Sequence, residues 1–399
     1  MSTETVKSTS AGSSSGPGAS KTTPPNRPSK TVNALTSGRL PKWAMPVLVL
    51  ASFVASFLIF LGIWAADPEG KPLINVVEQT GNLTIGYNWG GFLALGGVIF
   101  IVVGWLMSRI VEGARQAANR FVQSLVVTAF VLALIPLASL ITILFINGLP
   151  GLVDPDFFLH DSSRPGERGG LHAIVGTLLI TFFTSLITIP IGIFTAVYIV
   201  EYGRGGRLTK AITFFVDVMT GIPSIVAGLF AFALFMLFTQ TFGGDLTTVR
   251  AGIVGSIALM VLMLPTVVRS SEEMIRLVPQ ELREASYALG VPKWLTIVKV
   301  VLPTCLAGLV TGVLLAIARV IGETAPLLVA AGMSINMNTN PFGGVMSSLP
   351  TFVYQQWNFT TAEGNQLAWA GALVLLLIVV VLNAIGRVVS YYFSPRGSR

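Results

Sequence analysis

The sequence has very little of what most metal sites require. Its 399 residues include one cysteine, Cys305, and two histidines, His160 and His172. A single cysteine excludes an intramolecular disulfide and a thiolate metal site. Two isolated histidines with acidic neighbours are more often solvated side chains than metal ligands. We therefore predict neither a metal site nor a bound cofactor in this chain.

Nucleotide-hydrolysing and catalytic motifs are missing as well. No segment reads G-x-x-x-x-G-K-[ST], so the chain cannot hydrolyse ATP with a phosphate-binding loop of that type. No Ser/His/Asp grouping and no pair of carboxylates stands out for acid–base chemistry. Basic residues interleaved with aromatic residues, which a nucleic-acid binder needs, are not found either. We predict a protein that is not an enzyme and does not bind nucleic acid.

Charged residues are scarce, at 11%, whereas hydrophobic residues reach 53% and the mean hydropathy is +0.76. These values are typical of a protein that crosses the membrane several times. A helix needs about 20 apolar residues to cross about 30 Å of hydrocarbon. Runs of this kind lie near 44–65, 89–108, 122–147, 172–200, 211–240, 250–268, 303–331 and 367–390. The prediction is an all-α integral membrane protein with about eight transmembrane helices.

The first 40 residues differ in composition from the apolar segment that follows them. Residues 1–40 are rich in Ser, Thr, Gly and Pro and have few apolar side chains. Such a segment cannot bury enough surface to offset the entropy of ordering, so we predict a disordered tail. The apolar run behind it is too long and begins too late for a signal peptide.

The distribution of basic residues predicts the orientation. With the amino terminus in the cytoplasm, the inner segments hold 20 of the 25 Lys and Arg residues. The outer loops hold four, namely Lys71, Arg164, Arg168 and Arg250. An excess of Lys and Arg on cytoplasmic loops is the usual rule. The net charge of +7 is therefore explained by topology.

A polar stretch separates the sixth and seventh apolar runs. It contains Glu284, Ala285 and Ser286, then Gly290 after three residues, then V-V-L-P at 300–303 after nine more. This spacing resembles the EAA loop of bacterial ABC-importer permeases, which reads E-A-A, three residues, G, nine residues, I, any residue, L-P. In that family the loop docks into a groove on a separate ATPase subunit. The resemblance implies that these four residues couple the chain to an ATPase.

Local signals within 269–303 agree with a folded loop. Pro279 ends the helix that leaves the membrane, and 280–289 read as one short helix. Gly290 suits the left-handed residue that follows a helix end. A second short helix from Lys293 should lead to the next span. The alternative interpretation is an ordinary amphipathic cytoplasmic loop.

Three charged residues lie well inside the predicted spans, away from their ends. Arg319 and Glu323 are four residues apart in 303–331, so they should share a helix face where they can meet. A charge in the hydrocarbon costs about 2.5–3.5 kcal/mol, so such residues usually face a partner or a cavity. The pair is either a neutralised packing contact or part of an anion path. Asp217 could pair with Arg319, or stay protonated if it is unpaired.

Two groups of small residues indicate special helix geometry. Gly221 and Pro223 together favour a kink or local unwinding inside a span, which is tolerated where backbone is buried in protein or lines a cavity. A plain packing kink is the alternative. Gly308, Gly312 and Ala316 form a ridge on one helix that would let a neighbouring backbone approach closely.

Several further motifs narrow the resemblance. The segments A-R-V-I-G-E-T-A-P-L-L at 318–328 and T-G-I-P-S-I-V-A-G-L-F at 220–230 resemble PstA-type permeases of phosphate-specific ABC importers. So do L-V-P at 277–279 and the outer segment at 349–357. The resemblance covers about 120–395 and implies the type I ABC-importer permease fold. The family core has six helices over 121–395, so 41–120 would be an added N-terminal helix pair.

The resemblance implies a function and partners. The chain would be a permease of the bacterial inner or plasma membrane, in contact with lipid, that passes inorganic phosphate inward. Energy would come from ATP and Mg on a PstB-type ATPase dimer. A PstC-type permease and a PstS-type phosphate-binding protein would complete the complex. Arg319, Glu323 and Asp217 would belong to the translocation path or its gate, with the helix break at Gly221 and Pro223.

Three other functions remain open at this point. The same architecture could carry sulfate, molybdate or another small solute, because an external binding protein largely selects the cargo. A secondary transporter driven by an ion gradient could use Asp217 and Glu323 to carry protons. The coupling-like loop and the lack of a clear internal repeat argue against it. The chain could also be a membrane scaffold or sensor that moves nothing.

Overall fold

The computed structural model describes residues 40–41, 43–66, 75–79, 82–86, 89–163, 169–203, 205–243, 249–359 and 361–393. The predicted disordered tail therefore lies, up to residue 39, outside the described residues. Contacts divide the chain within one long helix, α3 (Ala114–Val153), between Ile135 and Pro136. The two units on either side of this division are described one at a time.

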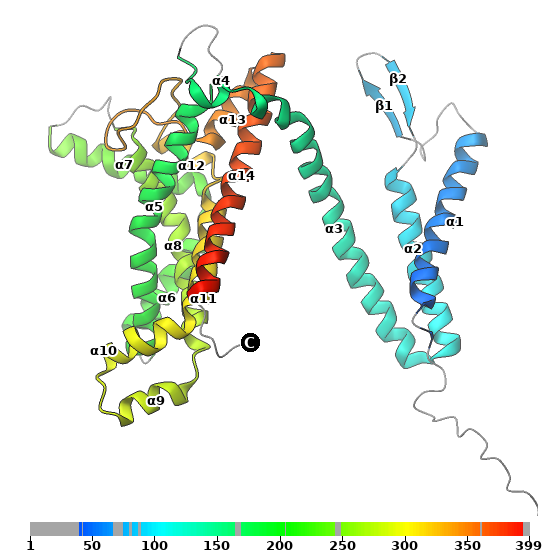
Figure 1. Cartoon of the computed structure of the whole chain (residues 1–399), viewed down its shortest axis with the longest axis horizontal. Helices are drawn as coiled ribbons and strands as arrows, with labels where there is room; N and C mark the ends of the chain where they lie inside the picture. Colours follow the sequence, from blue (N-terminus) through cyan, green and yellow to red (C-terminus); the bar gives the residue numbers. More distant parts are fainter. Residues whose placement is uncertain are drawn as a thin grey trace, which may run out of the picture. The chain divides into compact units, whose positions relative to one another are not determined.

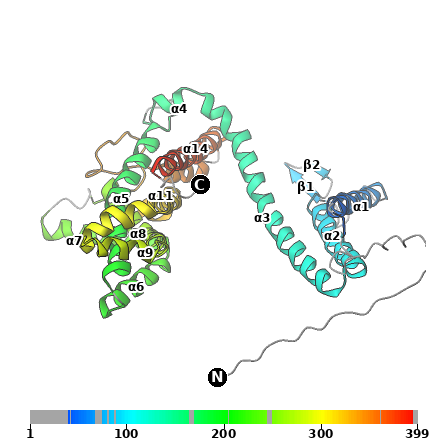
Figure 2. The same ribbon diagram turned by 60° about the horizontal axis from the view of Figure 1, so that its bottom comes forward.

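The first unit is built on two adjacent helices, α1 (Ala44–Ala66) and α2 (Trp89–Val111). They lie side by side in Figures 1 and 2. Between them in sequence is a short antiparallel hairpin, β1 (Asn75–Gln79) with β2 (Asn82–Gly86). The hairpin was not predicted. It is the one departure from all-α structure among the described residues, and the overall class is confirmed.

The interface between α1 and α2 depends on a glycine. A Cβ on Gly96 would lie 2.6 Å from the Phe53 ring, so the helices could not approach as they do with a larger residue there. Phe92 packs edge-on against both Phe53 and Phe57, with ring centroids 5.7 and 6.1 Å apart. Close approach at small residues is how helices pack where lipid removes the hydrophobic driving force.

The second unit comprises the C-terminal part of α3 and all later helices. Their bounds are α4 (Asp156–Leu159), α5 (Leu171–Val197), α6 (Arg207–Thr220), α7 (Ser224–Thr241), α8 (Gly252–Arg276), α9 (Gln280–Ala288), α10 (Lys293–Thr296), α11 (Leu302–Val320), α12 (Ala325–Ala330), α13 (Leu349–Asn358) and α14 (Ala362–Phe393). Two five-residue π turns, Tyr198–Tyr202 and Ile297–Val301, precede the loop after α5 and the start of α11. In Figure 1, α9 and α10 lie at one end of this unit and α4 and α13 at the other.

Eight helices among the described residues are long and apolar enough to cross a membrane, as predicted. One predicted span, 211–240, is instead two helices, α6 and α7, with the break where the sequence predicts it. Gly221 follows the last residue of α6, and Pro223 precedes the first residue of α7. Proline has no amide hydrogen to donate, so the helix cannot continue through it without losing a bond.

Helix α8 forms the centre of the second unit. It packs against α5 on one side and α11 on another, and its residues Leu259, Met263 and Val267 are buried in the largest apolar cluster. The predicted small-residue ridge on α11 faces α8. A Cβ on Gly312 would lie 2.6 Å from the Ser270 hydroxyl, and one on Gly308 would lie 2.2 Å from the Met274 sulfur.

The close contact between Gly312 and Ser270 predicts that a larger residue at position 312 destabilises the protein. Gly312→Val should lower the thermal midpoint of the purified protein in detergent, because overpacking costs about 1–3 kcal/mol. Gly62→Val is the matched control, since a Cβ at Gly62 meets nothing within 4 Å. Equal midpoints for the two variants would show that the ridge does not control the packing of α8 on α11.

Candidate functional site

The coupling-like loop begins where α8 ends. Helix α8 continues to Arg276, so Arg269 and Glu272 lie within a membrane-spanning helix and not in the loop. The loop proper begins at Leu277. The first residues of the polar stretch at 269–303 therefore form the last turns of α8, which ends three residues before Pro279, close to the end that the sequence predicts.

The turn after α9 has the predicted geometry. Gly290 has φ +76°, which is the left-handed conformation. Its amide donates to the Tyr287 carbonyl over 2.9 Å, and the amide of Val291 donates to the Ser286 carbonyl over 3.2 Å. These two bonds make a complete Schellman motif, which satisfies the last carbonyls of the helix. The chain direction after α9 is therefore fixed by backbone bonds.

The three residues of the E-A-S motif point in different directions. Glu284 and Ala285 are exposed, whereas Ser286 is buried and its hydroxyl lies 2.8 Å from that of Thr296 on α10. Ser286 thus joins the two short helices and is not part of their outer surface. Beyond it, Leu289 is 83% exposed at the tip of the loop.

The second short helix does not stop before the next span. From Lys293 the chain runs as α10, then the π turn, then α11, as one continuous membrane-spanning helix. Pro303 is the second residue of α11 and lies in its first turn, as the sequence predicts. It cannot donate a backbone hydrogen bond, and the widened turn before it accommodates that loss.

The predicted contact between Arg319 and Glu323 is not made. Helix α11 ends at Val320, and Glu323 lies in the turn that follows, where its amide donates to the Val320 carbonyl over 3.1 Å. Arg319 is exposed, with its Nη1 3.5 Å from the Thr266 hydroxyl on α8. The two residues would share a face only if the helix continued, and the turn carries Glu323 away from it.

Asp217 has a partner that the sequence did not indicate. Its carboxylate bonds to Arg269 of α8, not to Arg319 as suggested. Arg269 also bonds to Glu272 over 3.0 Å, and Glu272 bonds to Arg276 over 2.8 Å. These four residues form a charge ladder, a name we keep for them below. The 269/272/276 spacing follows one helix face and is the signal that could have revealed it.

Arg319 lies next to the charge ladder but is not neutralised by it. Two carboxylates and two guanidinium groups cancel, so the ladder carries no net charge. Thr266, which Arg319 approaches, lies one turn before Arg269 on the same face of α8. No described carboxylate lies within ion-pair distance of Arg319, so its positive charge is not neutralised within the described part of the chain.

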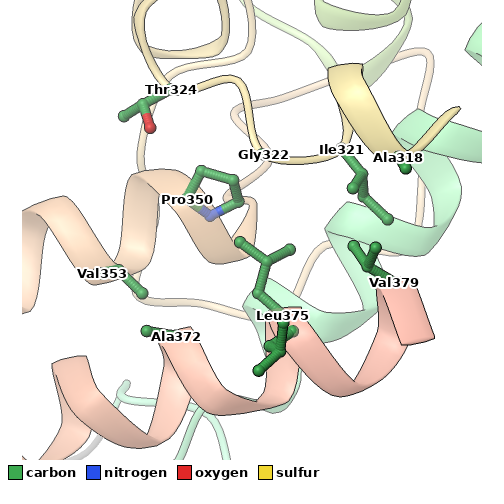
Figure 3. Close-up of a pocket in the computed structure, with 10 residues that line it drawn as sticks. Ala318, Ile321, Gly322, Thr324, Pro350, Val353, Ala372, Leu375 and Val379 are labelled. Carbon is green, nitrogen blue, oxygen red and sulfur yellow. The ribbon is translucent and has the colours of Figure 1, made fainter. Parts of the chain in front are cut away.

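An apolar cavity of about 350 Å³ lies behind the turn after α11. Figure 3 shows Ile321 and Gly322 on one side and Leu375 and Val379 of α14 on the other. Its lining carries no charge and cannot hold an anion. A Cβ on Gly322 would meet nothing within 4 Å, so the turn that carries Glu323 is free of close contacts there.

The loops at the opposite end of the unit are held by Asp161, between α4 and α5. Its carboxylate accepts from the amide of Met337 over 3.0 Å and from the hydroxyl of Ser163. The hydrogen bond from Ser163 lowers the pKa of Asp161, and the bond from Met337 adds to this against an opposing effect of burial. The carboxylate thus ties the loop before α5 to the one before α13.

Comparison with known proteins places this geometry in context. Residues 188–399 match the family model described as "Binding-protein-dependent transport system inner membrane component". The phosphate transport system permease protein PstA 1 of Mycobacterium tuberculosis is 41% identical over 286 residues, which cover 71% of this chain and 90% of that protein. PstA of Pasteurella multocida is 37% identical over 286 residues, covering 71% and 97%.

A solved structure shares the fold. The crystal structure of a bacterial alginate ABC transporter in complex with an alginate pentasaccharide-bound periplasmic protein contains a chain with a TM-score of 0.50 and 16% identity. The match covers 68% of this chain and 96% of that one. At this identity the likeness concerns the fold alone.

The lowered pKa of Asp161 predicts how pH acts on the loop contact. A carboxyl whose pKa falls on folding stabilises the fold above its unfolded pKa, near 3.9, and this stabilisation is lost as the pH falls through the lower folded value. The thermal midpoints of wild type and Asp161→Asn should therefore differ by a constant amount from neutral to mildly acidic pH and converge in strong acid. A difference that disappears already near neutral pH would contradict this assignment.

Proposed function

The chain belongs to the PstA family of phosphate transport system permeases, within the binding-protein-dependent inner membrane components, and we propose that it passes inorganic phosphate inward as one of two permeases of a heteromeric importer. It is a permease subunit with several membrane-spanning helices. The relatives named above are all phosphate permeases, and none of them favours sulfate, molybdate or an ion-driven mechanism.

The observation that carries the proposal is the exposed, unneutralised Arg319 on a membrane-spanning helix. Phosphate at neutral pH carries between one and two negative charges, so a cation in a low-dielectric path attracts it strongly. An arginine facing lipid would be costly, and partners or water usually surround such residues. The side of α11 that bears Arg319 therefore faces the path and the second, PstC-type permease.

The neutral charge ladder supports this assignment. Asp217 and Glu272 hold Arg269 and Arg276 as ion pairs, so these arginines do not add to the attraction for an anion. One free cation can attract phosphate without holding it too tightly for release. Glu323, one turn beyond Arg319, would moderate the attraction further and serve in the gate.

The coupling loop indicates where energy enters. We assign ATP hydrolysis to a PstB-type ATPase dimer that binds ATP and Mg and receives α9 in a groove. Two features support this: α9 is fixed by its caps, and its tip exposes Leu289, an apolar side chain with no contact in this chain that would bury it. A rigid apolar projection suits a docking contact whose core excludes water.

Orientation and partners follow from the same assignment. The end of the second unit that carries α9 faces the cytoplasm, and so does the amino terminus. The opposite end, where Asp161 ties two loops together, would receive a PstS-type phosphate-binding protein. Residues 121–395 would form the permease core, and 41–120 an added helix pair whose own contacts form a separate unit.

Replacing Arg319 tests the path. Arg319→Gln should abolish most phosphate uptake by the reconstituted complex, because the attracting charge is lost. Since Arg319 is not paired with Glu323, the double change Arg319→Gln with Glu323→Gln should remain defective. Uptake of labelled phosphate into vesicles measures both.

The matched control is Arg387→Gln. Arg387 is also an exposed arginine on a membrane-spanning helix, α14, but it lies beside Thr311 and Leu315 of α11 and not beside Thr266 of α8. It should transport normally. Full uptake by Arg319→Gln at wild-type expression would remove Arg319 from the path, and rescue by the double change would leave the pair as a packing contact.

Replacing Leu289 tests docking. Leu289→Glu should prevent the ATPase subunit from co-purifying with the permease, because a buried charge at the contact costs more than the lost apolar area. Leu208→Glu, at a 59% exposed position outside the loop, is the control and should retain the ATPase. If the ATPase binds Leu289→Glu with wild-type affinity and supports uptake, the tip of α9 is not the docking contact.

A further inference from the structure

A buried ion pair connects the coupling loop to a membrane-spanning helix. Arg283 of α9 donates from its Nε to Glu201 over 2.9 Å, although the two residues are 82 positions apart in sequence. Their side chains are only 14% and 6% exposed. Glu201 lies in the π turn that ends α5, and Arg283 precedes the first residue of the E-A-S motif.

Arg283 uses its remaining donors on the end of a second helix. Its Nη1 donates to the carbonyl of Val278 over 2.6 Å, and its Nη2 donates to the carbonyl of Ile275 over 3.0 Å. Both carbonyls belong to the end of α8 and the linker after it. A planar guanidinium can hold three separate acceptors in a fixed fork, which an ammonium group cannot do. Arg283 thus joins α9 to α8 and to α5 at once.

The other short helix reaches the same point. Lys293 of α10 donates to the backbone carbonyl of Glu201, and its Nζ lies 4.8 Å from the centre of the Tyr202 ring. A cation over an aromatic face is attracted by the ring's negative charge density. We call Arg283, Lys293 and Glu201 the bracket. Both short helices of the loop are therefore attached to the end of α5.

The remaining connections of α9 are weaker or local. Backbone linkers of three and four residues join it to α8 and α10, respectively, and the hydroxyl contact between Ser286 and Thr296 also joins it to α10. None of these reaches α5. Beneath the bracket, Val197, Ile275 and Ile297 belong to one buried apolar cluster, so the ends of α5, α8 and the π turn before α11 are packed together.

Helix α5 in turn contacts α8 beside the charge ladder. A Cβ on Gly192 would lie 2.6 Å from the Val267 side chain, so the two helices are closely packed there. Val267 is adjacent to Thr266, which Arg319 approaches. A shift of the inner end of α5 would therefore change the surroundings of Thr266 and of Arg319 beside it.

We propose that the bracket transmits movement of α9 to α5, with Glu201 and Arg283 as positioning residues for transport. The proposal rests on the docking role proposed above for α9. Buried charge-assisted hydrogen bonds resist displacement, and removing one partner leaves an unpaired buried charge. With the bracket intact, force applied to α9 reaches α5 directly. Without it, movement of α9 reaches α5 only indirectly, through the ends of α8 and α10.

The test is the ratio of phosphate transported to ATP hydrolysed in the purified, reconstituted complex. In Glu201→Gln the side chain keeps its size but loses its charge. ATP hydrolysis should continue near the wild-type rate, while transport per ATP falls by about five-fold or more, as expected for the loss of a coupling interaction. Glu281→Gln is the matched control, because Glu281 is an exposed carboxylate on α9, the helix that bears Arg283. Its ratio should not change.

A second variant covers the case in which Glu201→Gln does not assemble. Arg283→Lys keeps the charge but loses the fork, so it should lower the same ratio by a smaller factor in an assembled complex. The cost of the double change Glu201→Gln with Arg283→Gln should be less than the sum of the two single changes, because the bond between Arg283 and Glu201 is lost only once. A wild-type ratio in an assembled Glu201→Gln or Arg283→Lys complex would overturn the proposal.

The outcome for Leu289→Glu separates this proposal from the docking assignment. If Leu289→Glu prevents ATPase binding while Glu201→Gln transports with a wild-type ratio, α9 docks but the bracket does not transmit. If Leu289→Glu leaves binding and coupled transport intact, docking through the tip of α9 is itself wrong.

Discussion

A charge within a membrane-spanning helix must be paired, solvated or in contact with a ligand, and this constraint determines which residues of the second unit are available for function. In α8 it is met by pairing: Arg269 and Glu272 are held in the charge ladder with Asp217, from a neighbouring helix. Pairing within the chain offsets the cost of placing these charges in a membrane-spanning helix, and it also joins α8 to its neighbour. Arg319 has no such partner among the described residues, so the same constraint marks it as a residue that the rest of the complex, or its cargo, must satisfy.

The same need to satisfy polar groups explains why the coupling loop is rigid. The carbonyls at the end of α8 accept from Arg283, and those at the end of α9 accept from the amides of Gly290 and Val291. A loop whose backbone groups were left to water would be free to move relative to the helices. Here the bonds that satisfy helix ends are also the bonds that join α9, α8 and α5. Local stability and mechanical connection are therefore two consequences of one set of contacts.

The sequence predicted features that depend on local chemistry. The eight apolar runs, the helix break before Pro223 and the left-handed Gly290 all follow from properties of one residue or a short run. Contacts between helices could not be predicted in this way. Asp217 pairs with Arg269 and not with Arg319 because helix packing, which no single segment encodes, brings α6 beside α8. The buried position of Ser286 likewise depends on the fold of the α9–α10 pair.

Charge alone cannot make the proposed path specific. Phosphate and sulfate are both tetrahedral oxyanions, and one guanidinium attracts either. They differ in a proton: phosphate near neutral pH keeps at least one O–H, whereas sulfate has none. A site with an acceptor for that O–H rejects the ligand that lacks it, because the acceptor is then left unpaired. Glu323 is a half-buried carboxylate that the turn after α11 has separated from Arg319. In the proposed path Glu323 would be that acceptor, and because the turn holds it apart from Arg319, none of its lone pairs is used on that guanidinium.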